Sequence, residues 1–307
     1  MSFREGRQEV THVAVIDCRP RRHADGVFGR AGAKLRRESR SGEVLGSGAP
    51  GFVRDRANTS YLLWIGNQAK ILVDAGGGAY VRFGQVQAKF SDLAMILVSH
   101  LHPDHSSDLP AVLWSGRNTR NDVLPIVGPS GNEVAPAFNE FLMRLFDSKN
   151  GSWEVLSSVV GPGPGVKLDP RVVDITKQEP TTVYDRDGIK VTALGIPHGN
   201  LPTLAYRVET QGFSIVYSSD QTGTNPRFPD FAKGADILVM HLAIGVGSTN
   251  PIQALPAVVG RVAQSAPKQL VLSHIGNFDL DAAVVDVKKN YSGPLTIGAD
   301  LQCTQVK

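Results

Sequence analysis

The chain has 307 residues, of which 41% are hydrophobic and 20% are charged, and its formal net charge is +3. These proportions are typical of a folded globular protein and exclude a disordered or fibrous chain. No apolar run reaches the ~18 residues of a membrane-spanning helix, so we expect no membrane contact. The N-terminus lacks the apolar stretch of a signal peptide, which favours a cytoplasmic protein, with a trimmed secretory signal as the alternative.

The N-terminal part of the chain is basic. Residues 19–40 contain eight lysines and arginines against two acidic residues. Such an arm could contact phosphates of nucleic acid, but only Phe28 is available for base stacking, so a solvated loop is favoured. We therefore divide the chain into a basic arm with a first strand at 1–40 and a main part at 41–307, which together form one domain. Cys18 and Cys303 lack metal-binding spacing, and two buried free thiols are favoured over a disulfide.

Short apolar strands alternate with amphipathic helices along the rest of the chain. Strands are predicted at 60–65, 70–74, 95–99, 181–184, 189–196, 204–209, 213–218, 237–240 and 269–273, and helices at 106–117, 133–146, 251–265 and 280–290. Gly66-Asn67, Asp187-Gly188 and Gln211-Gly212 predict hairpin turns, and the glycines and prolines of 161–165 predict a loop. Hairpins in both halves with helices between strands indicate an α/β fold of two mixed sheets face to face, with helices outside.

Three of the eight histidines fall within six residues, in His100-Leu101-His102-Pro103-Asp104-His105. This run follows the predicted strand 95–99, where side chains leaving a sheet can converge. Alternate side chains of an extended segment point the same way, so His100 and His102 can bind one metal while Asp104 and His105 turn toward a second. Imidazole and carboxylate groups suit zinc well, and manganese or iron acceptably.

Three more candidate ligands, His198, Asp220 and His274, each follow a predicted strand. Alone, such a histidine is more often structural, but a two-metal site needs more ligands than the six-residue run supplies. The first metal is assigned to His100, His102 and His198, the second to Asp104, His105 and His274, and Asp220 is assigned as the bridge between them.

Two such metals would turn a bridging water into a hydroxide nucleophile at neutral pH. Asp104 could orient that hydroxide, which makes it a candidate catalytic residue as well as a ligand. His241, at the end of the strand 237–240, could donate a proton to the leaving group or could be structural. Asp74 is expected to hydrogen-bond to loops beneath the site.

The motifs of this chain occur in the order seen in the metallo-β-lactamase superfamily, and the branch resembles the ribonuclease Z and arylsulfatase-like group. They are 45–50 (LGSGAP), 72–76 (LVDAG), 99–105 (SHLHPDH), 196–198 (IPH), 217–220 (YSSD) and 272–274 (LSH). The resemblance covers about residues 41–300 and implies an αββα four-layer sandwich, two zinc ions and the ligand roles given above. A bridging carboxylate at Asp220 is similar to phosphodiesterase-type members, whereas true β-lactamases of the superfamily lack it.

Two departures from ribonuclease Z stand out. Leu242 follows His241 where those enzymes have a glutamate, and only 21 residues separate His198 from Asp220, which leaves no room for their long tRNA-gripping arm. Processing of tRNA is therefore not expected from the resemblance.

The leading hypothesis is a metal-dependent hydrolase of phosphodiesters or related small anionic esters. An arylsulfatase- or lactonase-type hydrolase of the same fold is the alternative. From other classes, a redox diiron enzyme is disfavoured because it usually has a glutamate where His102 stands, and a non-catalytic nucleic-acid-binding protein would use the basic arm. Nucleic acid and a second copy of the chain are both open as partners.

Overall fold

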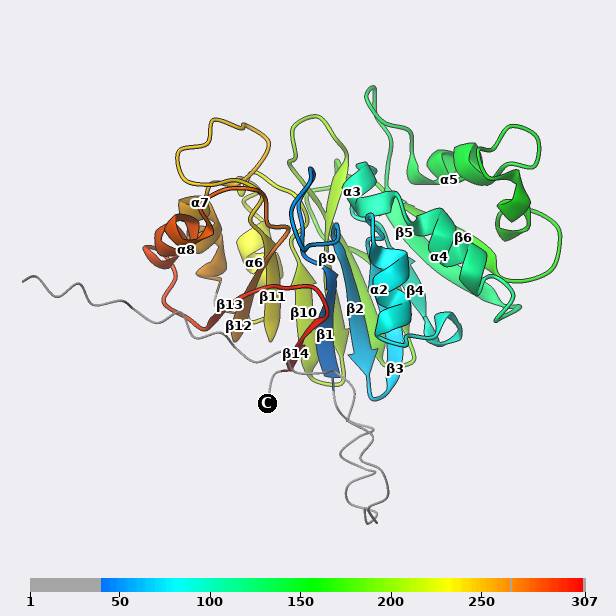
Figure 1. Cartoon of the computed structure of the whole chain (residues 1–307), viewed down its shortest axis with the longest axis horizontal. Helices are drawn as coiled ribbons and strands as arrows, with labels where there is room; N and C mark the ends of the chain where they lie inside the picture. The colour runs from blue at the N-terminus through cyan, green and yellow to red at the C-terminus, as the bar shows by residue number, and fades with distance from the viewer. Residues whose placement is uncertain (1–39, 266, 306–307) are drawn as a thin grey trace, which may run out of the picture.

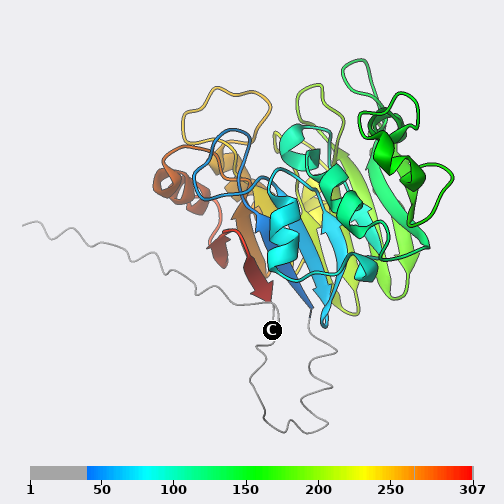
Figure 2. The same ribbon diagram turned by 45° about the vertical axis from the view of Figure 1, so that its right-hand side comes forward.

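Two sheets packed face to face, with helices on their outer faces, form the core of the molecule (Figure 1). The computed structural model describes residues 40–265 and 267–305. The helices of the two halves lie on opposite outer sides, which the turned view in Figure 2 makes clear. The expected α/β architecture, a four-layer αββα sandwich, is confirmed.

The first sheet has seven strands in the order β14-β1-β2-β3-β4-β5-β6. Pairing is antiparallel from β14 to β3 and parallel from β3 to β6, so the sheet is mixed. Its strands are β1 (Arg40–Gly46), β2 (Ser60–Ile65), β3 (Gln68–Val73), β4 (Met95–Leu97), β5 (Val123–Pro129), β6 (Lys167–Val173) and β14 (Gln302–Gln305).

The second sheet also has seven strands, in the order β13-β12-β11-β10-β9-β8-β7. Its antiparallel part, β7 to β10, is built from hairpins, and its parallel part runs from β10 to β13. The strands are β7 (Thr181–Arg186), β8 (Ile189–Ile196), β9 (Thr203–Thr210), β10 (Phe213–Tyr217), β11 (Ile237–His241), β12 (Gln269–Ser273) and β13 (Leu295–Ile297).

Three apolar layers hold the sandwich together. In β2, Tyr61 and Leu63 pack between the two sheets, whereas Leu62 and Trp64 pack under the helices of the first sheet. Both faces of this strand are therefore buried, which is why its sequence is apolar throughout instead of alternating. A third layer lies between the second sheet and its own helices.

Helices fall into two groups according to the sheet that they cover. The first sheet carries α2 (Ala79–Gln85), α3 (Pro103–Ser106), α4 (Leu109–Gly116), α5 (Phe138–Phe146) and the 3-10 turns η1 (Phe90–Asp92) and η2 (Glu154–Val159). The second sheet carries α6 (Phe228–Ala232), α7 (Pro256–Ala263) and α8 (Leu280–Lys288).

Several predicted elements differ from the observed ones at their ends. The predicted helix 106–117 is observed as α4, which starts after Asp108, while Ser106 is the last residue of α3. Helix α7 starts at Pro256, five residues later than predicted, because proline is favoured at the first helical position. The strands β1, β5, β6, β13 and β14 were not predicted.

Cys303, on β14, is disulfide-bonded, so the expectation of a free thiol there is wrong. That expectation rested on the rarity of disulfides in reducing compartments, a rule that takes no account of structure. Cys18 lies outside the described residues, as does the basic arm up to residue 39 with its predicted first strand. Within 40–265 and 267–305, no helix has the length and apolar character needed to cross a bilayer.

Candidate metal centre

The predicted metal ligands converge at one rim of the sandwich, where strands of both sheets end. The run His100–His105 follows β4 and overlaps the start of α3, which lies at the upper rim in Figure 1. His198 follows β8, Asp220 follows β10, and His274 follows β12 directly. His102 is half-buried, and the other six side chains are buried. The structure therefore brings all seven predicted ligands to one place.

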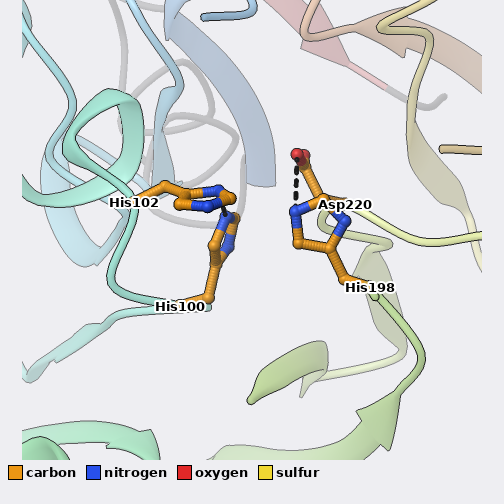
Figure 3. A group of neighbouring side chains, drawn as sticks. All are labelled: His100, His102, His198 and Asp220. Atoms are coloured by element: carbon orange, nitrogen blue, oxygen red, sulfur yellow. Dashed lines mark hydrogen bonds and ion pairs between the residues drawn. The ribbon is translucent and has the colours of Figure 1, made fainter. Parts of the chain in front are cut away.

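The first donor set contains His100, His102, His198 and Asp220, whose ligand atoms all lie within 4.8 Å of one another (Figure 3). His100 Nε2 lies 3.0 Å from His102 Nδ1, and His198 Nε2 lies 3.5 Å from Asp220 Oδ2. The four side chains come from three loops, two of which belong to the second sheet. This set can hold one metal ion.

The second donor set, as assigned from the sequence, comprises Asp104, His105, His274 and the other oxygen of Asp220. His274 Nε2 lies 3.2 Å from His105 Nε2, 3.2 Å from Asp104 Oδ2 and 3.1 Å from Asp220 Oδ1. His105 Nε2 lies 3.6 Å from Asp104 Oδ2 and 3.5 Å from Asp220 Oδ1. Asp220 thus contributes one carboxylate oxygen to each set.

These separations fit a shared metal ion. Two nitrogen ligands of one tetrahedral zinc lie roughly 3.3 Å apart, since each zinc–nitrogen bond is about 2.0–2.1 Å long. In the second set, the nitrogens of His105 and His274 lie 3.1–3.6 Å from each other and from the carboxylate oxygens of Asp104 and Asp220. In addition, His198 Nε2 is buried without a hydrogen-bond partner among the described residues, although buried polar atoms rarely stay unpartnered. A bound metal would supply that partner.

Two histidines are oriented by hydrogen bonds to their other ring nitrogen. His105 Nδ1 lies 2.8 Å from Asp74 Oδ2, and His198 Nδ1 lies 2.9 Å from the carbonyl oxygen of Ile252. Both acceptors lack a proton to donate, so each Nδ1 carries a hydrogen and Nε2 is the nitrogen that faces the donor set. Asp74 also accepts hydrogen bonds from the backbone N–H (2.7 Å) and hydroxyl (2.8 Å) of Ser99, which confirms the expectation that it ties loops beneath the site.

The backbone turns sharply where three of these loops leave their strands. Asp74, Ser219 and His274 have φ angles of 56°, 52° and 54°, in the left-handed region that residues other than glycine seldom adopt. Such conformations concentrate at functional sites, where the surrounding structure holds them in place.

His241 lies beneath Asp220. Its Nδ1 is 2.7 Å from Asp220 Oδ1, its Nε2 is 3.1 Å from the hydroxyl of Tyr61, and its ring stacks on that of His274 with centroids 4.6 Å apart. Burial lowers the pKa of His241 to about 4, so the ring is neutral at pH 7. Its Nδ1–H then donates to Asp220, and its Nε2 lies against the hydroxyl of Tyr61, which donates to Ser273 Oγ over 3.0 Å. Because both nitrogens are engaged inside the protein, the contacts favour the structural alternative over proton donation to a leaving group.

By distance alone, His241 could also belong to the second set, since its ligand atom lies within 4.8 Å of those of His105, Asp220 and His274. The 2.7 Å separation from Asp220 Oδ1 is that of a hydrogen bond and is shorter than the spacing between two ligands of one zinc.

The protonation states of the buried groups suit metal binding. Burial lowers the pKa values of His100 and His102, so both rings are neutral and can offer lone pairs. Burial would raise the pKa of Asp220, but the neighbouring His274 and His105 hold it well below its usual range. Burial alone would lower the pKa of His105, but the carboxylates of Asp74 and Asp220 raise it, so metal binding there must release a proton.

Sequence reasoning missed several residues around the ligands, among them Tyr61, which contacts His241, and Ile252 and Gln253, which contact His198 and Asp220. Tyr61 lies inside an apolar strand, where it looks like a core residue, and Ile252 acts through its backbone carbonyl. Gln253 lies in the loop between β11 and α7 and donates from Nε2 to Asp220 Oδ2 over 2.6 Å. In the sequence, Gln253 is marked only by its position a few residues before the helix α7. That position alone is too weak a signal to identify it as a site residue.

Replacing Asp74 with asparagine tests its orienting role. The amide nitrogen of an asparagine can donate where the carboxylate only accepts, so His105 would lose its fixed tautomer. We expect zinc affinity of the second set to fall about 10- to 100-fold, as is typical when a histidine ligand loses its carboxylate partner. Competition with a chromogenic chelator measures this, and the exposed Asp281→Asn on α8 is the matched control. Equal affinities in the two variants would contradict the role.

Comparison with known proteins agrees with the geometry. A family model described as a β-lactamase superfamily domain matches residues 69–275. Ribonuclease Z of Mycobacterium avium (strain 104) is 29% identical over 285 residues, covering 86% of this chain and 97% of the relative. Ribonuclease Z of Mycolicibacterium paratuberculosis is 32% identical over 220 residues, covering 69% and 74% respectively.

Among solved structures, the metallo-β-lactamase fold protein YhfI of Bacillus subtilis superposes with a TM-score of 0.69 at 19% identity. The match covers 88% of this chain and 100% of that protein. At this identity the likeness supports the fold, while the family model and the curated relatives establish the family. The chain therefore belongs to the metallo-β-lactamase superfamily of hydrolases, in its ribonuclease Z-like branch.

Proposed function

We propose that this hydrolase cleaves phosphodiesters with two divalent metal ions. Its imidazole and carboxylate ligands suit zinc best. The observation that carries the proposal is Asp220, whose two oxygens reach the two donor sets at 3.5 Å and 3.1–3.5 Å. His100, His102 and His198 would hold one metal, and Asp104, His105 and His274 the other. When bound, two such ions acidify a water molecule and neutralise the charge that develops on a phosphate ester.

The protein itself surrounds the two metal sites with buried carboxylates. Asp104 and Asp220 are buried and carry pKa values below the usual range, so both remain carboxylates at neutral pH. Asp104 Oδ2 lies beside His274 and His105, where it can accept a proton from the attacking water as well as bind. His102 is the half-buried member, and substrate would enter on its side.

The relatives named ribonuclease Z favour RNA as a second candidate substrate. In this chain the stretch between His198 and Asp220 is taken up by β9, β10 and short turns. It contains no long insertion of the kind that grips tRNA in ribonuclease Z. A small phosphodiester therefore remains the leading proposal, with RNA as the alternative.

Chelation tests the proposed activity directly. Zinc-loaded protein is expected to hydrolyse bis(p-nitrophenyl) phosphate, to lose this activity after treatment with a strong chelator, and to recover it when zinc is restored. The release of p-nitrophenolate is followed by absorbance. Rates that are the same with and without chelator would refute the two-metal proposal.

The same assay format separates the alternatives. Faster turnover of p-nitrophenyl sulfate or of an aryl lactone would replace the phosphodiester proposal with the arylsulfatase- or lactonase-type one. Faster cleavage of a precursor tRNA than of the aryl ester would favour RNA. The absorption spectrum of the purified protein identifies a diiron centre if one is present.

A further inference from the structure

The loop between β11 and α7 touches two ligands of the first donor set through adjacent residues. The carbonyl oxygen of Ile252 accepts from His198 Nδ1 over 2.9 Å, and Gln253 Nε2 donates to Asp220 Oδ2 over 2.6 Å. The side chain of Asn250 shapes this segment, because its oxygen accepts from the backbone N–H of Ile252 over 3.0 Å.

The segment is also packed closely against the chain that follows His198. Gly199 has a φ angle of 57°, and a Cβ atom there would come within 2.7 Å of Ile252 Cγ2. A side chain at this position would push the two loops apart, so the glycine permits the close approach. The contact of Ile252 with His198 is therefore fixed by packing as well as by the hydrogen bond.

Asp220 receives one donor on each carboxylate oxygen. His241 Nδ1 lies 2.7 Å from Oδ1, and Gln253 Nε2 lies 2.6 Å from Oδ2. A carboxylate has about four lone-pair sites, so each oxygen keeps a lone pair for a metal ion. Two donors on opposite oxygens fix the plane of the group, whereas one donor alone would leave it free to turn about its Cβ–Cγ bond.

We propose that Gln253 is a positioning residue of the metal centre, which holds Asp220 in its bridging orientation while Ile252 holds His198. This inference rests on the proposed function, since it assumes that the two donor sets bind metal. The loop after β11 would thus hold His198 and Asp220 of the first donor set in place. The other two members of that set, His100 and His102, come from the first sheet. Gln253 then acts on metal affinity through Asp220, without touching the metal itself.

Replacing Gln253 with methionine tests the proposal, because methionine keeps the length of the side chain and lacks the N–H donor. Gln253→Asn is the second variant, since its amide stays polar but is too short to reach Asp220. Zinc stoichiometry and affinity are measured by competition with a chromogenic chelator, and the melting temperature is measured on the metal-free protein. The matched control is Gln264→Leu, which removes an amide that bonds the carbonyl of Asn290 far from the site.

In both Gln253 variants we expect the weaker of the two zinc affinities to fall about 10- to 100-fold, with the metal-free melting temperature unchanged. The Gln264 variant is expected to bind zinc as the wild type does. Wild-type zinc affinity in the Gln253 variants would overturn the positioning role, and so would a fall in affinity matched by a fall in the metal-free melting temperature. If the wild-type protein itself bound no zinc, the proposed two-metal function would be refuted. That result differs from one in which the wild type binds zinc and the Gln253 variants bind it equally well.

Discussion

Replacing Asp220 with alanine is expected to reduce kcat/KM for a phosphodiester by about a thousandfold or more. The substitution removes the side chain that the two donor sets share, and two-metal charge stabilisation contributes several kcal/mol to such reactions. It also leaves His241 Nδ1–H and the amide of Gln253 without their acceptor. Steady-state rates and zinc content of the purified variant measure the effect.

The control for this experiment is Asp230→Ala on α6, an exposed acidic residue in the first turn of its helix. It is expected to leave both the rate and the zinc content unchanged. An Asp220→Ala protein that retained two zinc ions and more than a tenth of the wild-type rate would contradict the bridging role.

Asp104→Ala and His241→Ala form a pair that decides which residue completes the second donor set. We expect Asp104→Ala to lower the zinc content from two ions toward one and to reduce the rate about a hundredfold or more, since it removes both a ligand and a proton acceptor. His241→Ala is expected to keep two zinc ions. Its rate should fall less, because only a hydrogen bond to Asp220 is lost. Zinc per chain is measured by atomic emission.

The reverse pattern, with two zinc ions in Asp104→Ala and one in His241→Ala, would assign His241 as the ligand. That result would be compatible with the distances within the group His105, Asp220, His241 and His274. It would leave Asp104 as a proton acceptor only.

The sequence predicted strands that are marked by an apolar run, such as 60–65 and 269–273, or by a neighbouring hairpin turn, such as 189–196. The strands 60–65, 189–196 and 269–273 were predicted with the observed ends. By contrast, β6 contains charged residues and Pro170 and lies at a sheet edge, and β14 is a short polar strand that pairs with β1 from the far end of the chain. Such strands owe their conformation to their partners, and no local pattern reveals them.

The candidate site likewise contains residues that have a local sequence signal and residues that do not. The run from His100 to His105 is recognisable because its residues are close in sequence and rare in composition. His198, Asp220 and His274 could be added because each follows an apolar strand. Gln253 and Tyr61 could not, because their roles depend on which loop and which strand the fold places against Asp220 and His241.

The donor atoms come from both sheets, and this has a consequence for folding. Neither half of the sandwich holds a complete set, so full affinity for the ions exists only after the two halves have docked through their shared apolar layer. Ions that bind only the docked state favour it by mass action, by about 2.7 kcal/mol at a free concentration one hundred times the dissociation constant. The ions that serve the reaction would therefore also stabilise the docking of the two halves. Removing them would lower the free energy that holds the two sheets together.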